Sequence, residues 1–411
     1  MNSSGYFRFA IENRRFLAFG LLVSFASSPG QTIFIGVFGP ELRAEFGLSH
    51  GDWSSIYMAG TLLSALVLPW SGRQLDRFDL RRFTLTICIG LTVACLAMAS
   101  TAGVVWLIAA VFLLRQFGQG LMSMTAMISM ARYFDADRGK AISIGALGLA
   151  IGEAGLPFFT VLAIGAIGWR PTYVVTGVIV ALAIAPAVSW LLKDHGERHR
   201  RHLEANRAPV LSTNGGRSWT RAEVLRDTRF YLLMVGMMAP SLVLTGMFFH
   251  HLHLADVKGW SHAWITGNYA VYAVVITVTM LVAGRLVDRY GAVRLMPLHL
   301  LPMGLGMVVL AAFDAPLWAA VYLFLAALTS GISFTASVAM WAELYGVRHI
   351  GAIKSLASAI MVFGSALGPL FMGLLFDAGI TMGAVCLMFA LYTVAGTALI
   401  WRGLRGVPAR G

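Results

Sequence analysis

Two ionisable residues lie deep inside long apolar stretches of the chain. Arg115 is near the centre of residues 105–131, and Glu153 has a comparable position within 140–167. A cation in the middle of a membrane costs at least about 2.5–3.5 kcal/mol on insertion scales, so it needs a partner or a function. The planar guanidinium fork fits a carboxylate, and a carboxyl group in a low-dielectric setting near a cation suits proton transfer. We predict that Arg115 binds an anionic solute and Glu153 couples a proton; a permanent structural Arg115–Glu153 pair is the alternative.

Further polar side chains within or beside apolar stretches are candidates for contact with a solute. The sequence Ser-Ser-Pro-Gly at 27–30 predicts a break in the first stretch, because Pro and Gly free backbone carbonyls that a cavity or a neighbour must satisfy. A packing kink is the alternative for this break. The predicted substrate-binding residues besides Arg115 are Gln31, Thr32, Tyr57, His250, Asn268 and Tyr272. His250, His251 and His253 do not share one helical face, so no metal site is predicted.

The elements that position these residues are membrane spans. The 411 residues are 58% hydrophobic and 12% charged, whereas a soluble domain has roughly a quarter charged residues. Stretches of about 20 apolar residues predict twelve transmembrane helices. They cover residues 16–38, 52–72, 83–103, 105–131, 140–167, 171–192, 229–254, 262–284, 295–313, 317–341, 350–376 and 381–401.

The distribution of positive charge orients these spans. Nearly all Lys and Arg residues fall in loops on one side, and Arg43, Arg170 and Lys258 fall on the other. The positive-inside bias therefore predicts cytoplasmic N- and C-termini. The net charge of +12 is explained by this asymmetry, and no nucleic-acid partner is predicted. We expect a six-helix bundle at 1–192, a polar cytoplasmic linker at 193–228 and a second six-helix bundle at 229–411.

An offset of 212 residues relates the two halves. Gly72, Asp76 and Arg77 recur as Gly284, Asp288 and Arg289, and GLSHGDW from Gly47 recurs as GWSHAWI from Gly259. Repeated hydrophobic units joined by a polar loop are typical of secondary transporters. Gly pairs four residues apart, at 148 and 152 and at 364 and 368, let helices approach closely. We expect the two halves to slide on these pairs.

The repeated loops GRQLDRFDLRR and GRLVDRYGAVR resemble the signature loop of the major facilitator superfamily, and the resemblance covers almost the whole chain. It implies an all-α fold of two pseudo-symmetric six-helix bundles. Leu114 to Gly120, LRQFGQG, resembles the bacterial relatives of monocarboxylate and oxalate/formate transporters. Each loop carboxylate is expected to cap a helix start in the other half. The predicted gating residues are Asp76, Arg77, Asp288, Arg289 and Glu343, with Glu343 pairing with Arg289 or Arg294.

These features predict a transporter rather than an enzyme. No GxxxxGK[ST] loop is found, so neither an ATP-driven pump nor a cofactor is expected. The leading hypothesis is a secondary active symporter of a small organic anion and protons. It would work by alternating access, as a monomer, in the bilayer of the bacterial inner membrane. The alternative is proton-coupled efflux of drugs or amphipathic metabolites.

Overall fold

The chain folds into two helical units. The computed structural model describes residues 9–134, 138–193, 196, 219–346 and 349–405, and this part contains helices and no strand. Unit 1 comprises Met1–Phe46 and Ile56–Ser212, and unit 2 comprises Gly47–Ser55 and Thr213–Gly411. The division after Ser212 lies within the polar segment 193–228. The short segment Gly47–Ser55 contacts the second half of the chain, although its sequence neighbours belong to unit 1.

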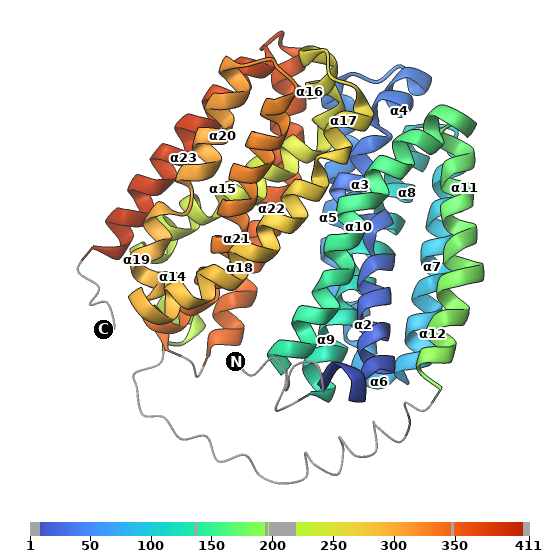
Figure 1. Cartoon of the computed structure of the whole chain (residues 1–411), viewed down its shortest axis with the longest axis horizontal. Coiled ribbons are helices and arrows are strands. Elements are labelled where there is room, and N and C mark those ends of the chain that lie inside the picture. The colour runs from blue at the N-terminus through green and yellow to red at the C-terminus, as the bar shows by residue number, and fades with distance from the viewer. Residues whose placement is uncertain (1–8, 135–137, 194–195, 197–218, 347–348, 406–411) are drawn as a thin grey trace. The chain divides into compact units, whose positions relative to one another are not determined.

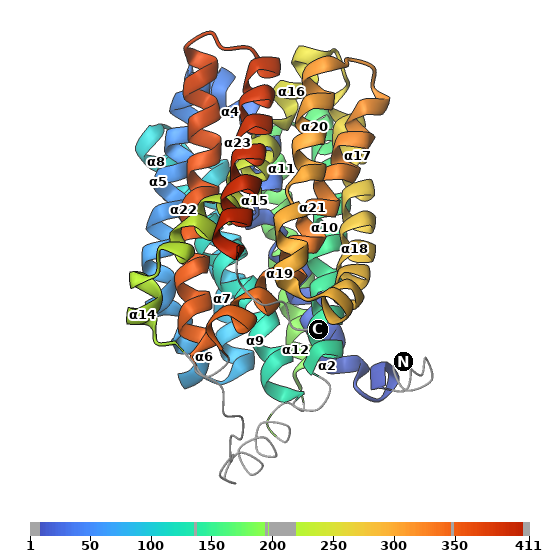
Figure 2. The same cartoon turned by 90° about the vertical axis from the view of Figure 1, so that its left-hand side faces the viewer.

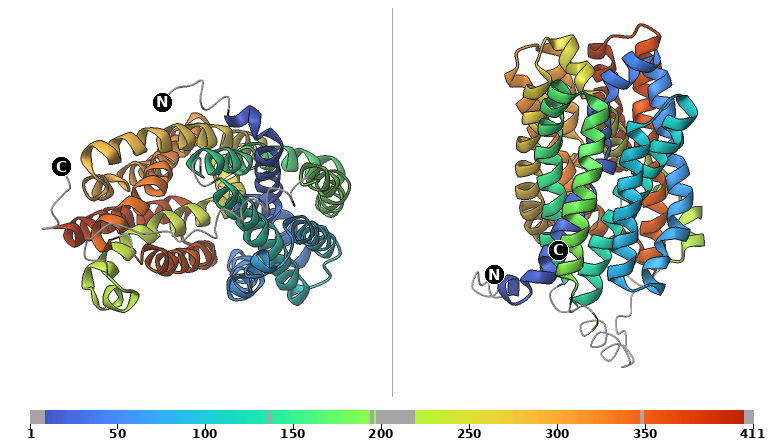
Figure 3. Two further views of the ribbon diagram at one scale, coloured as in Figure 1. Left: turned by 90° about the horizontal axis from the view of Figure 1, so that it is seen from below. Right: turned by 90° about the vertical axis from the view of Figure 1, so that its right-hand side faces the viewer.

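Unit 1 contains the Arg115 helix and its neighbours. Its helices are α2 (Arg14–Ala26), η1 (Ser28–Gly30), α3 (Thr32–Val37), α4 (Gly39–Phe46), most of α5 (His50–Gly72), α6 (Gln74–Arg77), α7 (Leu80–Ala99), α8 (Val104–Leu114), η2 (Arg115–Met122), α9 (Ser123–Tyr133), α10 (Arg138–Ile167), α11 (Trp169–Ile179), η3 (Val180–Ile184) and α12 (Ala185–Leu191). Helix α2 packs against α10, and α7 packs against α11 (Figure 1, Figure 3).

Unit 2 is built in the same way. Its helices are α14 (Arg221–Arg226), α15 (Thr228–Phe249), α16 (His251–Lys258), α17 (His262–Gly267), α18 (Tyr269–Tyr290), α19 (Ala292–Leu295), η4 (Met296–Leu298), α20 (Leu301–Ala312), α21 (Leu317–Tyr345), α22 (Ile350–Asp377) and α23 (Met382–Leu404). Helix α15 packs against α22 and α23, and α21 packs against α18 and α20 (Figure 2).

Eleven helices in the described part of the chain are long and apolar enough to cross a membrane. The first predicted span, 16–38, is not among the eleven, because it is interrupted at the Pro-Gly sequence where a break was expected. It breaks into α2, the 3-10 turn η1 at Ser28–Gly30, and α3. Pro29 cannot donate a backbone hydrogen bond, and Gln31 takes an extended conformation with ψ of 149°.

The 212-residue repeat appears in the backbone itself. Gly47 and Gly259 both adopt left-handed φ angles, +61° and +67°, where glycine carries no steric penalty. The following serines cap the next helix alike: Ser49 Oγ accepts from Asp52 N at 3.0 Å, and Ser261 Oγ accepts from Trp264 N at 3.1 Å.

The repeat differs where the first signature loop has Asp79 and the second has Gly291. Gly291 has a φ of +81°, which favours glycine. Asp79 has a φ of −56° and instead caps α7, its carboxylate accepting from Arg82 N at 3.1 Å. The two loops therefore start the next helix by different means.

The glycine pairs lie at helix contacts inside each unit, which corrects the expectation that the two halves slide on them. A Cβ atom on Gly148 of α10 would collide with the Leu21 carbonyl of α2. One on Gly368 of α22 would collide with the Leu242 carbonyl of α15. Without a hydrophobic effect in lipid, close backbone approach is what lets such helices gain packing energy. The glycines therefore hold each bundle together.

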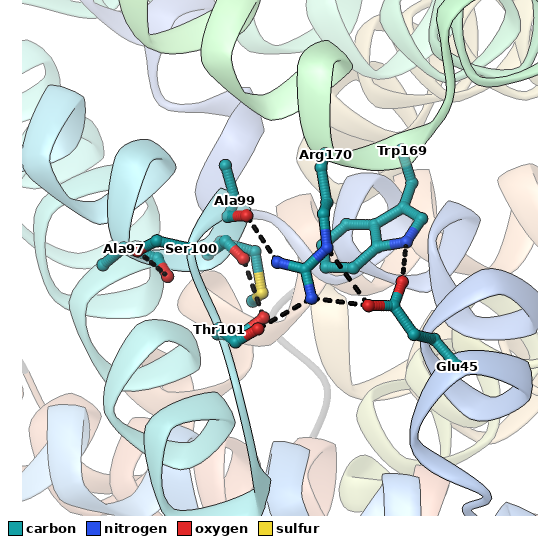
Figure 4. A network of polar contacts seen from close by, with 8 residues as sticks. Glu45, Ala97, Ala99, Ser100, Thr101, Trp169 and Arg170 are labelled. Atoms are coloured by element: carbon teal, nitrogen blue, oxygen red, sulfur yellow. Dashed lines mark hydrogen bonds and ion pairs between the residues drawn. The ribbon is translucent and has the colours of Figure 1, made fainter.

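One polar network fastens one end of unit 1. The Arg170 guanidinium at the start of α11 donates to the carbonyls of Ala99 and Thr101, at 2.6 and 2.7 Å, and to Glu45 Oε1 of α4 at 2.5 Å (Figure 4). Trp169 Nε1 donates to Glu45 Oε2 at 2.7 Å. The hydrogen bond from Arg170 holds the pKa of the Glu45 carboxyl below its ordinary value of 4.5. The network joins α4, the α7–α8 loop and α11.

Candidate functional site

Arg115 lies where the α-helix of its span changes to the π-helical segment η2, and its side chain is 5% exposed. Its Nη1 atom donates to the Gly30 carbonyl at 3.0 Å and approaches Thr32 Oγ1 at 3.5 Å. The Gly30 carbonyl lies at the break between η1 and α3, where Phe34 N bonds to Gln31 O instead. Arg115 thus satisfies a carbonyl that the Pro-Gly break has freed.

The other edge of the Arg115 guanidinium forms no hydrogen bond with a described residue. Nε is fully buried, and it forms no hydrogen bond with any described residue. Nη2 also has no hydrogen-bond partner within the described part of the chain, and it is not among the fully buried atoms. In a planar guanidinium, Nε–H and one Nη2–H point along the same edge, the geometry that binds a carboxylate with two parallel bonds. This edge can accept an anionic group without breaking the bond to Gly30.

Thr32 and Tyr57 lie close to Arg115 within unit 1, and Gln31 belongs to a neighbouring set of polar contacts. Thr32 Oγ1 and the Tyr57 hydroxyl are 2.5 Å apart, and the Arg115 guanidinium lies 5.6 Å from the centre of the Tyr57 ring. Gln31 Nε2 lies 3.5 Å from Ser123 Oγ, which donates to Ser27 Oγ at 3.0 Å. Thr32 of the broken helix and Tyr57 of α5 therefore lie beside Arg115, whereas Gln31 contacts Ser123 of α9.

Glu153 lies on α10, next to Gly152, whose Cα faces the Ser28 side chain of η1. The Glu153 side chain is half-buried and forms no hydrogen bond or ion pair with any residue that the structure describes. No ion pair within 4.0 Å joins it to Arg115, so the permanent pair, our alternative interpretation, is absent from this structure. A membrane carboxyl with no fixed partner can change its protonation without breaking a protein contact.

His250 belongs to a ring cluster in unit 2 and is 4% exposed. Its Nε2 lies 3.2 Å from Ser54 Oγ and 3.1 Å from the Pro369 carbonyl. The His50 ring packs against those of His250 and His253, with centroid distances of 5.7 and 4.2 Å. The residues between Gly47 and Ser55 thus dock on the α15–α16 junction of unit 2.

Asp377, at the end of α22, fixes the same segment. Its carboxylate accepts from Ser49 Oγ at 2.7 Å, His50 N at 3.0 Å and Gly51 N at 2.8 Å. These are backbone and cap groups at the first turn of α5, where a negative charge is favourable. Sequence reasoning missed Asp377, because its partners lie more than 300 residues earlier in the chain.

The remaining predicted binding residues of unit 2 already have protein partners. The Tyr272 hydroxyl donates to Ser330 Oγ at 2.9 Å, and Asn268 Nδ2 donates to the Trp264 carbonyl at 2.8 Å. Both ring nitrogens of His251, beside His250, form hydrogen bonds with tyrosine hydroxyls. Nδ1 lies 2.7 Å from the Tyr269 hydroxyl, and Nε2 lies 2.9 Å from the Tyr322 hydroxyl. The structure thus brings Tyr272 to Ser330 of α21.

The predicted gating residues differ in how far the structure describes them. The side chains of Asp76 and Arg77, in α6, lie outside the described residues. Asp288 and Arg289 are exposed in the last turn of α18. Glu343 forms no ion pair with Arg289 or Arg294 in the described part, contrary to the pairing that we expected. It accepts from the first amides of α19, Ala292 N at 3.0 Å and Val293 N at 3.3 Å, which need an acceptor at a helix start.

Each unit also contains a cavity that the sequence did not locate. The unit 1 cavity, about 190 Å³, has a mostly apolar wall that includes Phe25, Pro29 and Phe159. The unit 2 cavity, about 390 Å³, has a wall rich in serine. The spacing of Ser330, Ser333 and Ser337 on one face of α21 was the available sequence signal for the second cavity.

No described group of three or more His, Cys, Asp or Glu side chains could hold a metal ion.

Comparison with known proteins identifies the fold. The sequence profile of the Major Facilitator Superfamily matches residues 20–278 and 259–410. A search of curated protein sequences gave no match. Among solved structures, a bacterial homologue of the human lysosomal transporter Spinster, inward-facing and unoccupied, has 16% identity over 96% of this chain and 97% of its own, with a TM-score of 0.66. The nucleoside transporter NupG has 15% identity over 95% and 99% of the two chains, with a TM-score of 0.70.

Proposed function

Because the chain belongs to the major facilitator superfamily, we propose that it carries a small organic anion together with a proton by alternating access. The observation that carries this proposal is the Nε–Nη2 edge of Arg115, which lies inside a membrane span and has no hydrogen-bond partner among the described residues. A desolvated guanidinium edge with two unsatisfied donors gains more from a carboxylate than from a neutral or cationic solute. The resemblance of residues 114–120 to the monocarboxylate and oxalate/formate branch supports the same substrate class.

Glu153 supplies the proposed proton site. It lies on α10, which packs against the broken first helix that also holds Arg115 through Gly30. With no fixed partner among the described residues, Glu153 can take up a proton in one state and release it in another. In proteoliposomes, we expect Glu153→Gln to keep solute exchange and to lose accumulation driven by a pH gradient. Normal accumulation by this variant would assign Glu153 a structural role.

A thermal-shift titration of the purified protein with hexanoate tests the anion site. Hexanoate should stabilise the wild type and the control Arg226→Ala, which removes an exposed arginine of α14. In Arg115→Ala the ligand-induced shift should disappear, because losing charge-assisted hydrogen bonds worth about 1.5–3 kcal/mol weakens binding by roughly 10- to 100-fold. Arg115→Lys keeps the charge and should restore part of the shift. An undiminished shift in Arg115→Ala would show that the carboxylate binds elsewhere.

The apolar cavity of unit 1 favours a second candidate function. Its wall of Phe25, Phe34 and Phe159 suits an amphipathic or drug-like compound better than a carboxylate. Under this alternative the protein would be a proton-coupled exporter of such compounds. Stabilisation by apolar amines, but not by hexanoate, would favour the exporter.

The distribution of charge along the chain also bears on the membrane orientation of the protein. We propose a monomer in the bacterial inner membrane with both termini in the cytoplasm and with residues 193–228 as a cytoplasmic linker. The asymmetry of Lys and Arg between the two sides supports this orientation. Asp76, Arg77, Asp288, Arg289 and Glu343 are proposed to control the cytoplasmic gate, since they belong to the two signature loops or, for Glu343, bind the start of α19.

A further inference from the structure

The serine-rich cavity of unit 2 is lined by α15, η4, α21 and α22 and by His299, which follows η4, within the candidate spans of this unit. Its hydroxyl-bearing wall residues are Ser241, Ser330, Ser333, Ser337 and Ser358. Ser330, Ser333 and Ser337 are spaced three and four residues apart, on one face of α21, and Ser358 lies on α22. A wall with five serines inside a membrane bundle is a hydrogen-bonding surface.

Four of these hydroxyls form no hydrogen bond with the backbone of their own helices. Serine and threonine in a helix commonly donate to the carbonyl three or four residues earlier, as Ser365 does to Val362 O at 2.7 Å on α22. Ser241, Ser333, Ser337 and Ser358 form no such bond and no other hydrogen bond with a described residue. Ser333 Oγ is fully buried, so its lack of a partner costs free energy unless something in the cavity binds it.

Two further groups define what the cavity can bind. His299 Nδ1 lies 2.5 Å from the Met296 carbonyl, so Nδ1 carries the hydrogen and Nε2 of the neutral ring is an acceptor. His299 Nε2 has no partner in the described residues, and the residue lines the cavity. Lys354, one turn before Ser358 on α22, adds an ammonium group. The wall therefore offers an acceptor, several hydroxyls that both donate and accept, and one cation.

We propose that this cavity is a binding subsite for a polyhydroxylated carboxylate, such as a sugar acid. The ligand's hydroxyl groups would donate to His299 Nε2 and exchange hydrogen bonds with Ser333 and Ser337, and its carboxylate would pair with Lys354. A plain fatty acid leaves the serines unsatisfied, and a neutral polyol leaves the cation without an anion. This cavity is a second position for the solute, whose carboxylate would be held by Lys354 here and by Arg115 in unit 1. The inference narrows the substrate class of the proposed function and rests on it for the role in transport.

Three six-carbon probes separate the contributions: gluconate has hydroxyls and a carboxylate, hexanoate has the carboxylate alone, and sorbitol has hydroxyls alone. Binding to the purified full chain is measured by calorimetry. We expect gluconate to bind the wild type at least about tenfold more tightly than hexanoate or sorbitol. Ser333→Ala combined with Ser337→Ala should remove this advantage over hexanoate without weakening hexanoate. Lys354→Gln should reduce the advantage over sorbitol.

Ser365→Ala is the matched control, because it removes a serine hydroxyl from α22 that does not line the cavity. It should leave all three affinities unchanged. Equal binding of gluconate and hexanoate to the wild type, or an equal effect of the serine variants on both, would overturn the subsite while the anion proposal stands. If neither acid binds, the proposed function fails together with the subsite. The two failures are therefore distinguishable.

Discussion

Replacing Gly148 with alanine should loosen unit 1, because α10 and α2 touch through the backbone at this residue. A Cβ atom there would lie 2.8 Å from the Leu21 carbonyl carbon and 2.9 Å from Phe25 N, closer than real Cβ contacts. Neither atom belongs to a flexible side chain, so the two helices must move apart. Gly155, two turns along the same helix, is the matched control, since its Cβ would meet only Phe159 Cε2 at 3.8 Å.

The comparison of the two variants isolates the helix contact. Gly to Ala in a helix interior gains roughly 0.5–1 kcal/mol from backbone entropy, and this gain is common to both. The difference is then the overpacking cost, about 1–3 kcal/mol. At roughly 2–4 °C per kcal/mol for units of this size, Gly148→Ala should melt roughly 2–12 °C below Gly155→Ala.

The assay is the fraction of purified protein that stays monodisperse in detergent after heating to a series of temperatures. Gly155→Ala should melt at or slightly above the wild-type temperature. If Gly148→Ala melts with Gly155→Ala, then α2 and α10 do not depend on backbone approach, and the packing explanation of the glycine pairs is refuted.

Two further predictions concern the carboxylates of Asp377 and Glu45. Asp377→Ala should speed the hydrogen exchange of segment 47–55 and lower the free energy of unfolding by about 1–2 kcal/mol, because three donors lose their acceptor. Unchanged exchange in this segment would contradict its docking on Asp377. Because the pKa of Glu45 is lowered mainly by Arg170, its ion pair stabilises the protein above pH 4.5 and is lost as the pH falls through the lowered pKa. The pair is partly exposed, so the free energy of unfolding of the wild type should exceed that of Glu45→Gln by only about 0.2–1 kcal/mol at neutral pH. The two proteins should reach the same melting temperature in acid, and a difference that persists there would contradict this role of the ion pair.

Much of the fold follows from the sequence, because local rules determine it. The superfamily predicted from the two signature loops is confirmed by the family match. The repeated glycine turns at 47 and 259 and the serine caps that follow them depend on neighbouring residues alone. The break at Pro29–Gly30 was likewise readable from one dipeptide, although it made the first span discontinuous.

The parts that could not be predicted depend on contacts between distant residues. Nothing in the sequence shows that the Arg115 guanidinium bonds to the Gly30 carbonyl, because backbone acceptors carry no residue signature. The histidines at 250, 251 and 253 were expected to lie on different helical faces, and the approach of the His50 ring to those of His250 and His253 needed the folded chain. Glu343 was assigned a cationic partner from charge, whereas unsatisfied amides at a helix start attract a carboxylate equally well.

The two edges of the Arg115 guanidinium are separate, so one can anchor the helix break while the other is available for the proposed anion. Nη1 holds the carbonyl freed by the Pro29–Gly30 break, which fixes the guanidinium plane before any solute arrives. A side chain already held in one orientation loses less conformational entropy when a ligand binds. Lysine, with one point-like ammonium on a flexible chain, cannot serve two directions in this way. We therefore infer that the proposed anion binds at the Nε–Nη2 edge without displacing the Gly30 bond, so the broken helix keeps its support in both the empty and the loaded protein.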